Sequence, residues 1–213
     1  MTDSEYNNYK DLRNAAWGIL LQYAPDALPV NARGLAESFN VTVLPYSDET
    51  ACALVESCGF EDLREDNQAF SVYTDRWYTL YDETVETPGF SIAHELAHIL
   101  LRHPAVKCEV GFFNAYYTSW NRDEMPQTAE EADANTLALR ILAPACVLRR
   151  LRDADAETLQ MLCGIPYILA EARIERINQL VQRDRFFTEK KEARVYELFK
   201  AYMDGTPELF VPE

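Results

Sequence analysis

The sequence is poor in the features that stabilise small secreted domains or bind zinc through sulfur. Its five cysteines are odd in number and scattered, and none of them forms a CxxC pair. This argues against a disulfide framework and a thiolate zinc site, and predicts reduced cysteines packed in the interior. The amino-terminal segment is polar and acidic, and no apolar run approaches the roughly 18 residues that a membrane span needs. We therefore expect a cytoplasmic protein that does not enter a membrane.

Positive charge is also scarce. The chain has 20 Lys and Arg against 35 Asp and Glu, which gives a net charge of −15. Because a nucleic-acid surface needs clustered basic side chains, we expect no direct nucleic-acid partner. The deficit lies in residues 1–144, with 9 basic and 23 acidic side chains, whereas residues 145–213 have 11 and 12. The acidic body could attract a basic partner protein, or it could simply keep the chain soluble.

Hydrophobic periodicity and turn residues predict a mixture of helices and short strands. Two segments rich in aromatic and β-branched residues, 69–75 and 76–82, indicate a hairpin that turns at Asp75-Arg76. Residues 91–101 form a predicted helix with Ser91 as its N-cap, and a second strong helix is predicted over residues 128–142.

The stretch between these two helices, residues 105–127, has many aromatic side chains and little periodicity, so it is interpreted as a long connection. No element is assigned to the acidic stretch after Pro45. The remaining predictions are a strand at 41–44 and helices at 9–22, 32–39, 147–151, 156–163, 166–182 and 189–203.

Two of the three histidines lie four residues apart in the apolar run SIAHELAHIL, residues 91–100. On a helix, His94 and His98 share one face, and Glu95 lies beside His94 around the axis. This is the H-E-x-x-H pattern, in which two imidazoles hold a metal ion and the carboxylate takes a proton from water activated by that ion. The competing interpretation is two hydrogen-bonded core histidines, but polar groups left unpartnered in such a helix would cost roughly 1 to 3 kcal/mol each. The pattern therefore favours a metal site.

A hydrolytic zinc site needs three protein ligands and one open position. The extended pattern HExxHxxGxxH is excluded, because Leu101 and Pro104 occupy the places of its glycine and third histidine. His103 lies about 140° from His98 on a continued helix and is interpreted as a surface or helix-end residue. The remaining candidates are carboxylates in the segment TAEEADANTLALRILAP.

Within that segment, Glu131 and Asn135 share a helix face at i, i+4, and an apolar stripe could pack the helix against the first one. Glu130 is the rival ligand, about 100° away around the helix. Thr128 and Glu131 also fit a capping box, in which the glutamate would bind only the backbone at the helix start. The spacing leaves these alternatives open.

Taken together, the two segments resemble the ImmA/IrrE family of zinc metallopeptidases. In that family the HExxH helix precedes a helix of the type E-x-x-A-N-x-(F/L)-A-x-x-(L/I)-L-x-P. Upstream, LPVNARGLAESFNVTVLPY and RWYTLYD are similar to the family's opening segment and to its strand before the active-site helix, so the resemblance covers about residues 10–145. It selects Glu131 as the third ligand and implies that Asn135 supports a ligand. The matching residues are Glu131, Ala134, Asn135, Leu137, Ala138, Ile141, Leu142 and Pro144.

The fold that this resemblance implies is α+β. Residues 1–145 would form a zincin-like domain of the gluzincin type, with a small antiparallel sheet packed on helices. Residues 146–213 would form a helical C-terminal extension packed on or beside it. Residues 154–180 mimic a helix-turn-helix, but their near-neutral charge does not favour DNA binding.

The activity that the resemblance implies is that of a hydrolase, a zinc-dependent metallo-endopeptidase. His94, His98 and Glu131 would hold Zn²⁺, and Glu95 would act as general base and then pass the proton to the leaving amine. Members of this family, often encoded by mobile elements, are similar to proteases that cleave a helix-turn-helix repressor. A basic DNA-binding repressor is therefore the expected protein substrate.

Two other functions compete with proteolysis. A regulatory or antitoxin-like binding protein could keep the zinc fold with little proteolytic activity, but such a protein would not need Glu95 as a general base. A purely structural zinc site is disfavoured because such sites have four protein ligands. A peptidase also needs a second group that stabilises the oxyanion, for which Tyr116 and Tyr117 are candidates.

Overall fold

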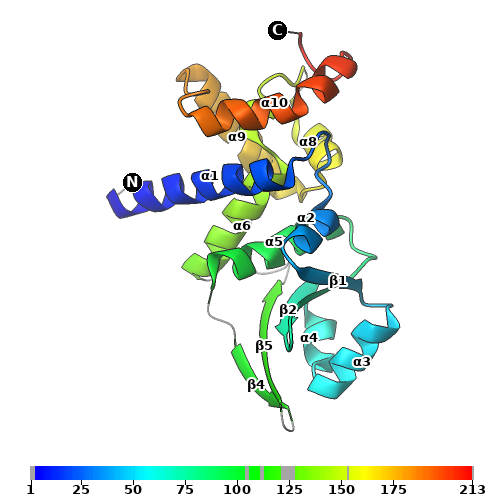
Figure 1. The fold of residues 1–213 in the computed structure, drawn as a ribbon. Helices are drawn as coiled ribbons and strands as arrows, with labels where there is room; N and C mark the ends of the chain where they lie inside the picture. Colours follow the sequence, from blue (N-terminus) through cyan, green and yellow to red (C-terminus); the bar gives the residue numbers. More distant parts are fainter. Residues whose placement is uncertain (1–2, 104–105, 111–112, 121–127, 153, 213) are drawn as a thin grey trace. The chain divides into compact units, whose positions relative to one another are not determined.

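The computed structural model describes the backbone of residues 3–103, 106–110, 113–120, 128–152 and 154–212, and side chains within residues 8–103, 128–152 and 154–212. The described chain is α+β (Figure 1). It divides into two compact units. Residues Ala32–Asn135 form the first, which we call the sheet unit, and Met1–Asn31 together with Thr136–Glu213 form the second, the helical unit.

This grouping differs from the division after residue 145 that the sequence suggests. The first helix and the second half of the helix that begins at Ala129 group with the C-terminal helices. The first helix belongs to this group because it packs against the last helix. Local sequence patterns do not predict such a long-range contact.

The sheet unit is built around one five-stranded sheet with the strand order β1-β3-β2-β5-β4. The hairpin between β2 and β3 is confirmed. The expectation of an antiparallel sheet is wrong for one pair, since β1 runs parallel to β3. Such a pair needs a long crossover, and two helices and β2 supply it. The elements of this unit are α2 (Ala32–Ser38), β1 (Val41–Pro45), α3 (Glu49–Cys58), α4 (Glu61–Asp66), β2 (Ala69–Tyr73), β3 (Trp77–Tyr81), α5 (Pro88–Leu101), β4 (Val106–Val110) and β5 (Phe113–Trp120).

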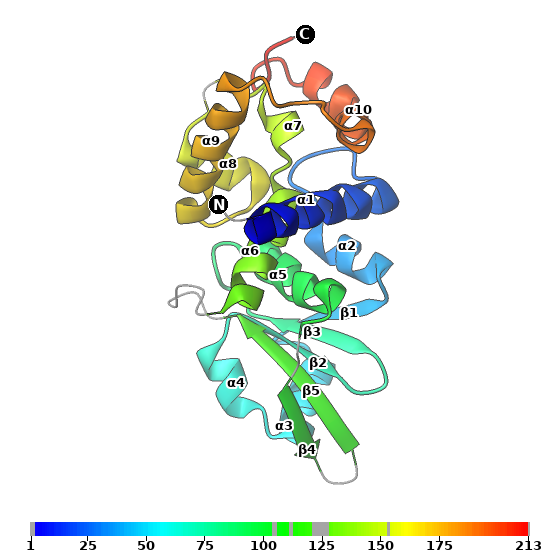
Figure 2. The same ribbon diagram turned by 90° about the vertical axis from the view of Figure 1, so that its left-hand side faces the viewer.

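The two faces of this sheet carry different side chains. Phe70, Val72 and Leu80 are buried in a hydrophobic cluster with side chains of α3 and α4. Side chains alternate along a strand, so Ser71 and Thr79 point to the opposite face, where both are buried and their hydroxyls are 2.8 Å apart. Helix α5 packs across β3, β2 and β5, on the face away from α3 and α4 (Figures 1 and 2). The sheet therefore supports the helix that carries the H-E-x-x-H pattern.

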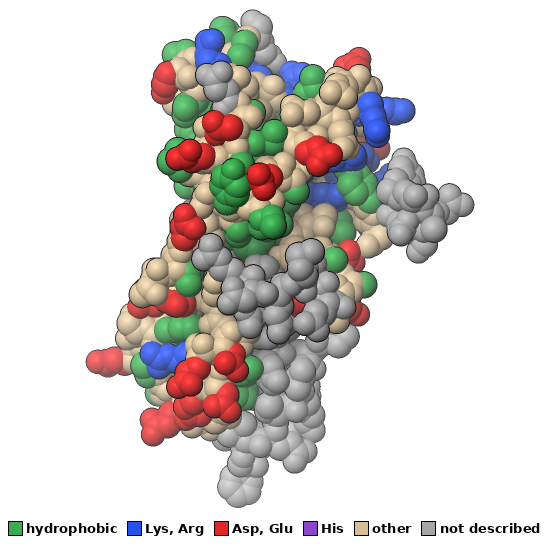
Figure 3. All heavy atoms as spheres, turned by 180° about the vertical axis from the view of Figure 1, so that it is seen from behind, with side chains coloured by type: hydrophobic (Ala, Val, Ile, Leu, Met, Phe, Trp, Pro, Cys, Tyr) green, Lys and Arg blue, Asp and Glu red, His purple; other side chains and the backbone are tan. Residues whose placement is uncertain are grey.

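The surface of α3 and α4 is acidic. Figure 3 shows red carboxylate side chains gathered over these helices. Six carboxylates on the two helices are exposed, at Glu49, Glu56, Glu61, Asp62, Glu65 and Asp66.

The helical unit is held together by pairwise helix packing. Helix α10 packs against both α1 and α7, and α8 packs against α9. The chain end is fixed by Arg150, whose Nε donates to the carbonyl of Val211 at 2.6 Å. No helix within the described residues is long and apolar enough to cross a membrane. Besides the second half of α6 (Ala129–Leu142), the elements of this unit are α1 (Asp3–Tyr23), α7 (Ala145–Leu148), α8 (Ala156–Cys163), α9 (Tyr167–Gln182) and α10 (Lys190–Gly205).

Candidate metal centre

Helix α5 begins three residues earlier than the sequence suggests. Pro88 occupies the first helical turn and Thr87 precedes it, so Ser91 is not the N-cap. Proline is favoured there because its missing N–H has no partner in the first turn in any case. Every side chain from Phe90 to His98 is buried. The H-E-x-x-H residues therefore lie inside the sheet unit.

The structure brings His94, His98 and Glu131 together. The Nε2 atoms of the two histidines are 2.9 Å apart. The Glu131 carboxylate reaches both of them, with Oε2 at 3.2 Å from His94 Nε2 and Oε1 at 3.2 Å from His98 Nε2. These three side chains form a group whose ligand atoms could hold a metal ion.

The spacing of these atoms fits a metal site. Two ligands at ordinary zinc bond lengths and tetrahedral angles lie about 3.3 Å apart. The observed separations of 2.9 to 3.2 Å are only slightly shorter than that. A small outward movement of the side chains would admit the ion.

Asn135 fixes the ring of His94. Its Oδ1 lies 3.0 Å from His94 Nδ1. An amide oxygen can only accept, so the Nδ1–H donates and the Nε2 of His94 carries a lone pair. Partners of this kind orient metal-binding histidines and fix their tautomer.

His103 contacts the ring of His98 as Asn135 contacts the ring of His94, and the sequence patterns do not predict this contact. The helix ends at Leu101, and Arg102 adopts the left-handed conformation with φ 57°. The chain therefore folds back, and the amide of His103 donates to the carbonyl of His98 at 3.1 Å. The two Nδ1 atoms are 3.0 Å apart. His103 lies just past the end of the helix and is half-buried, which agrees with the interpretation of a surface or helix-end residue, but that interpretation did not include the contact with His98.

The two ring contacts turn the Nε2 atoms of both histidines toward Glu131. Burial, together with repulsion from His98, lowers the pKa of His103, so its ring is neutral at pH 7 and can accept the Nδ1–H of His98. The Nε2 atoms of both ligand histidines then face each other and the carboxylate of Glu131. Such an arrangement is repulsive unless a proton or a cation lies between the three groups.

Glu131, rather than Glu130, faces the histidines. The Thr128 hydroxyl accepts the backbone N–H of Glu131 at 3.2 Å, which is half of a capping box. The Glu131 carboxylate is turned to His94 and His98 instead of the helix start. Glu130 is exposed. The cap thus explains Thr128 but not the direction of the Glu131 side chain.

The electrostatics of the centre favour the protonation states that a metal needs at two of the three groups, His94 and Glu131. Burial lowers the pKa of His94 to about 4, although the hydrogen bond to Glu131 opposes this. Burial alone would raise the pKa of Glu131, but its hydrogen bonds to the two histidines lower it to about 2. For His98, burial is outweighed by the Glu131 hydrogen bond and the Glu95 charge, so the pKa is raised. At pH 7 the centre therefore holds a neutral His94 and an anionic Glu131.

Glu95 is fully buried on the same helix. Its charge raises the pKa of His98, which places the carboxylate within electrostatic reach of the centre. Tyr116 and Tyr117 lie on β5, where their backbones pair with Tyr73 and Val72 of β2. Their side chains fall outside those that the structure describes, so the expected oxyanion role stays a prediction.

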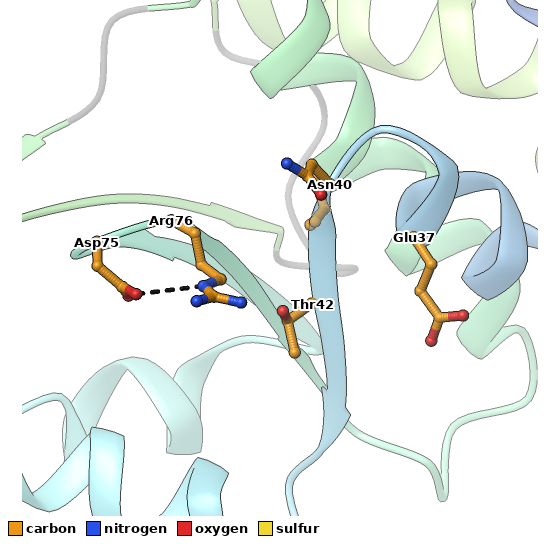
Figure 4. A pocket seen from close by; sticks show the side chains of 6 residues that line it. Glu37, Asn40, Thr42, Asp75 and Arg76 are labelled. Atoms are coloured by element: carbon orange, nitrogen blue, oxygen red, sulfur yellow. Dashed lines mark hydrogen bonds and ion pairs between the residues drawn. The ribbon is translucent and has the colours of Figure 1, made fainter.

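A separate depression in the sheet unit lies beside β1 (Figure 4). Its volume is about 570 Å³, and polar side chains such as Asn40 and Thr42 line it. Arg76 and Asp75 form an ion pair in this depression, and both side chains are exposed to solvent. None of the H-E-x-x-H residues takes part in it, so it is not the candidate centre.

Comparisons with known proteins add no relative from which a role could be transferred. No protein-family model, no curated protein and no solved structure matches the chain. The assignment of a function therefore depends on the geometry of the centre and on the sequence patterns that predict it.

Proposed function

We propose that the protein is a zinc-dependent metallo-endopeptidase of the ImmA/IrrE kind, with a zincin-like sheet unit. One observation carries the proposal. The donor atoms of His94, His98 and Glu131 converge, and Glu95 is buried on the same helix as the two histidines. Two imidazoles and one carboxylate form the ligand set of many hydrolytic zinc sites, which leave a fourth position for water or substrate.

Each residue of this centre would have a separate role in peptide hydrolysis. His94, His98 and Glu131 would hold the ion, and Asn135 keeps the His94 lone pair turned toward it. Zinc supplies a Lewis acid that polarises the scissile carbonyl and lowers the pKa of water. Glu95 would take the proton of the attacking water and return it to the leaving amine.

The substrate that fits the surface best is a basic protein. Exposed carboxylates cover α3 and α4 in the same unit (Figure 3), and the whole chain has a net charge of −15. An acidic surface raises the local concentration of a basic partner and speeds its association. A DNA-binding repressor of the helix-turn-helix type has this charge, and it is the substrate that we propose.

Cleavage of such a repressor tests the proposal. A purified helix-turn-helix repressor would be incubated with the zinc-loaded protein, and cleavage would be followed by mass spectrometry. We expect cleavage at one or a few defined peptide bonds. The rate for Glu95→Gln should be at least about 100-fold lower than for the wild type, because a general base contributes about 10²-fold to 10⁴-fold.

The control variant is Glu130→Gln, which makes the same change at an exposed position next to Glu131. It should cleave at the wild-type rate. Equal cleavage by wild type and Glu95→Gln would refute the assigned base. Tight binding of the repressor without any cleavage would instead support the regulatory alternative.

A further inference from the structure

The helical unit contains a cavity of about 740 Å³ that is unrelated to the H-E-x-x-H helix. Its lining comes mainly from α1, from α9, from residues 183–189 that follow α9, and from the junction of α6 and α7. Its charged lining consists of seven basic and two acidic side chains, in a protein whose acidic residues outnumber the basic ones. They are Lys10, Arg13, Arg140, Arg173, Arg176, Arg183, Arg185, Glu189 and Glu192.

Two of these arginines are buried. Arg140 is 8% exposed and Arg173 is 7% exposed. Arg140 donates to the backbone carbonyl of Tyr9 at 2.8 Å, and Arg173 donates Nε to the carbonyl of Ala143 at 2.8 Å. Among the described side chains, neither forms an ion pair with a carboxylate. Buried charges normally have a counter-ion, because removing a charge from water costs several kcal/mol.

Two more arginines lie beside them. Arg176 donates to the Tyr9 hydroxyl at 2.8 Å. The guanidinium carbons of Arg140 and Arg176 are 4.1 and 5.0 Å from the centre of the Tyr9 ring. The Nε of Arg13 is buried and has no hydrogen-bond partner within the described part of the chain. Four guanidinium groups thus line the cavity, and two of them are buried.

The pKa shifts of Tyr9 and Arg140 agree with a positive electrostatic potential in the cavity. Burial alone would raise the pKa of Tyr9, but the charges of Arg140 and Arg176 lower it. Burial, together with repulsion from Arg173 and Arg13, lowers the pKa of Arg140 to about 10 despite its contact with Tyr9. Burial also raises the pKa of Glu192.

From this geometry we propose that the cavity is a binding site for a small molecule with a di- or triphosphate group. Guanidinium groups bind phosphate oxygens through paired hydrogen bonds, and the volume lies within the 300–1,000 Å³ that is usual for small-ligand sites. The lining has five more positive than negative side chains, which favours an anion with several negative charges, such as a di- or triphosphate, over a single phosphate group. The guanidinium groups of Arg140 and Arg176 both contact the ring of Tyr9, so hydrogen bonds from arginines to phosphate oxygens provide the recognition.

The direct test is isothermal titration calorimetry with inorganic tripolyphosphate and, in a second arm, ATP. We expect one site per chain for both probes, with affinity that falls as NaCl is added. Arg176→Gln should weaken binding about tenfold, since a charge-assisted hydrogen bond is lost. The exposed triple variant Lys10→Gln, Arg183→Gln, Arg185→Gln should weaken it by a similar factor without disturbing the buried residues.

Arg194→Gln is the control, because Arg194 is exposed on α10 but does not line the cavity. It should bind as the wild type does. Removal of zinc by the probe would be the same in every variant, so it cannot imitate the expected pattern. Three results would overturn the proposal: no heat of binding at millimolar probe, equal affinity of wild type and both cavity variants, or tighter binding of a single-stranded oligonucleotide than of tripolyphosphate.

Discussion

At the scale of single residues, the candidate centre depends on two partners outside the H-E-x-x-H pattern. Asn135 holds His94, and His103 holds His98, each through Nδ1 at 3.0 Å. The first pair joins α5 to α6, and the second is made within one turn of chain. Both leave the Nε2 lone pairs directed at Glu131.

Replacing His103 tests whether this second contact matters for the metal. Loss of a partner that orients a metal ligand typically costs 10-fold to 100-fold in affinity. We expect His103→Ala to weaken zinc binding by about that factor in competition with a chromophoric chelator. His103→Asn should restore much of it, because its side-chain oxygen can accept from His98 Nδ1. Equal affinity in wild type and His103→Ala, with unchanged helix content, would rule out the contact as a positioning device.

The sequence predicts the histidine pair and Glu95, because an i, i+4 spacing fixes a common helix face. It leaves Glu131 and Glu130 unresolved by spacing, since a capping role and a ligand role require the same residue type. The role of His103 could not be predicted from helical geometry, because the helix ends before this residue. It depends on a left-handed residue, Arg102, at a position where glycine is the usual signal.

At the scale of elements, predictions succeed where the pattern is local. Helix α6 and the β2–β3 hairpin lie close to their predicted bounds. Strands β4 and β5 were interpreted as a connection, because pairing with a neighbouring strand decides their structure. Helix α3 was missed although its signals were present, with Asp48 as N-cap and Gly59 at φ 65° as C-cap. The acidic composition around it concealed them.

The cap of α3 supports a prediction about stability. The Asp48 carboxylate accepts the backbone N–H groups of Thr50 and Ala51 at 2.8 and 3.3 Å. Asp48→Ala should destabilise the sheet unit by about 1 kcal/mol in urea denaturation, the usual cost of losing such a cap. Asp48→Asn should lose much less, because the amide oxygen can still accept. A full loss in Asp48→Asn would indicate that charge, rather than the cap, is responsible.

At the scale of the whole molecule, the α+β class follows from the sequence but the grouping into units does not. The third member of the candidate centre, Glu131, lies 33 positions after His98. The helical unit combines the first helix with the last, a pairing that depends on long-range packing. Local patterns cannot encode either association.

Metal binding should stabilise the folded protein, because the ligands come together only when α5 and α6 are in place. A ligand present at about 1,000 times its Kd adds about 4 kcal/mol to the free energy of unfolding. We expect the thermal midpoint of the sheet unit to rise by several degrees with zinc and to fall with EDTA. In His98→Ala, zinc should produce no such shift. The same shift in that variant would place the bound metal elsewhere.

The central claim is that Glu131 completes a zinc site with His94 and His98. Metal analysis of purified wild type, Glu131→Ala and Glu130→Ala, each dialysed in the same buffer, tests it most directly. We predict one zinc per chain in wild type and in Glu130→Ala, and loss of most of the zinc in Glu131→Ala. Full zinc in Glu131→Ala, or none in the wild type after loading, would contradict the account.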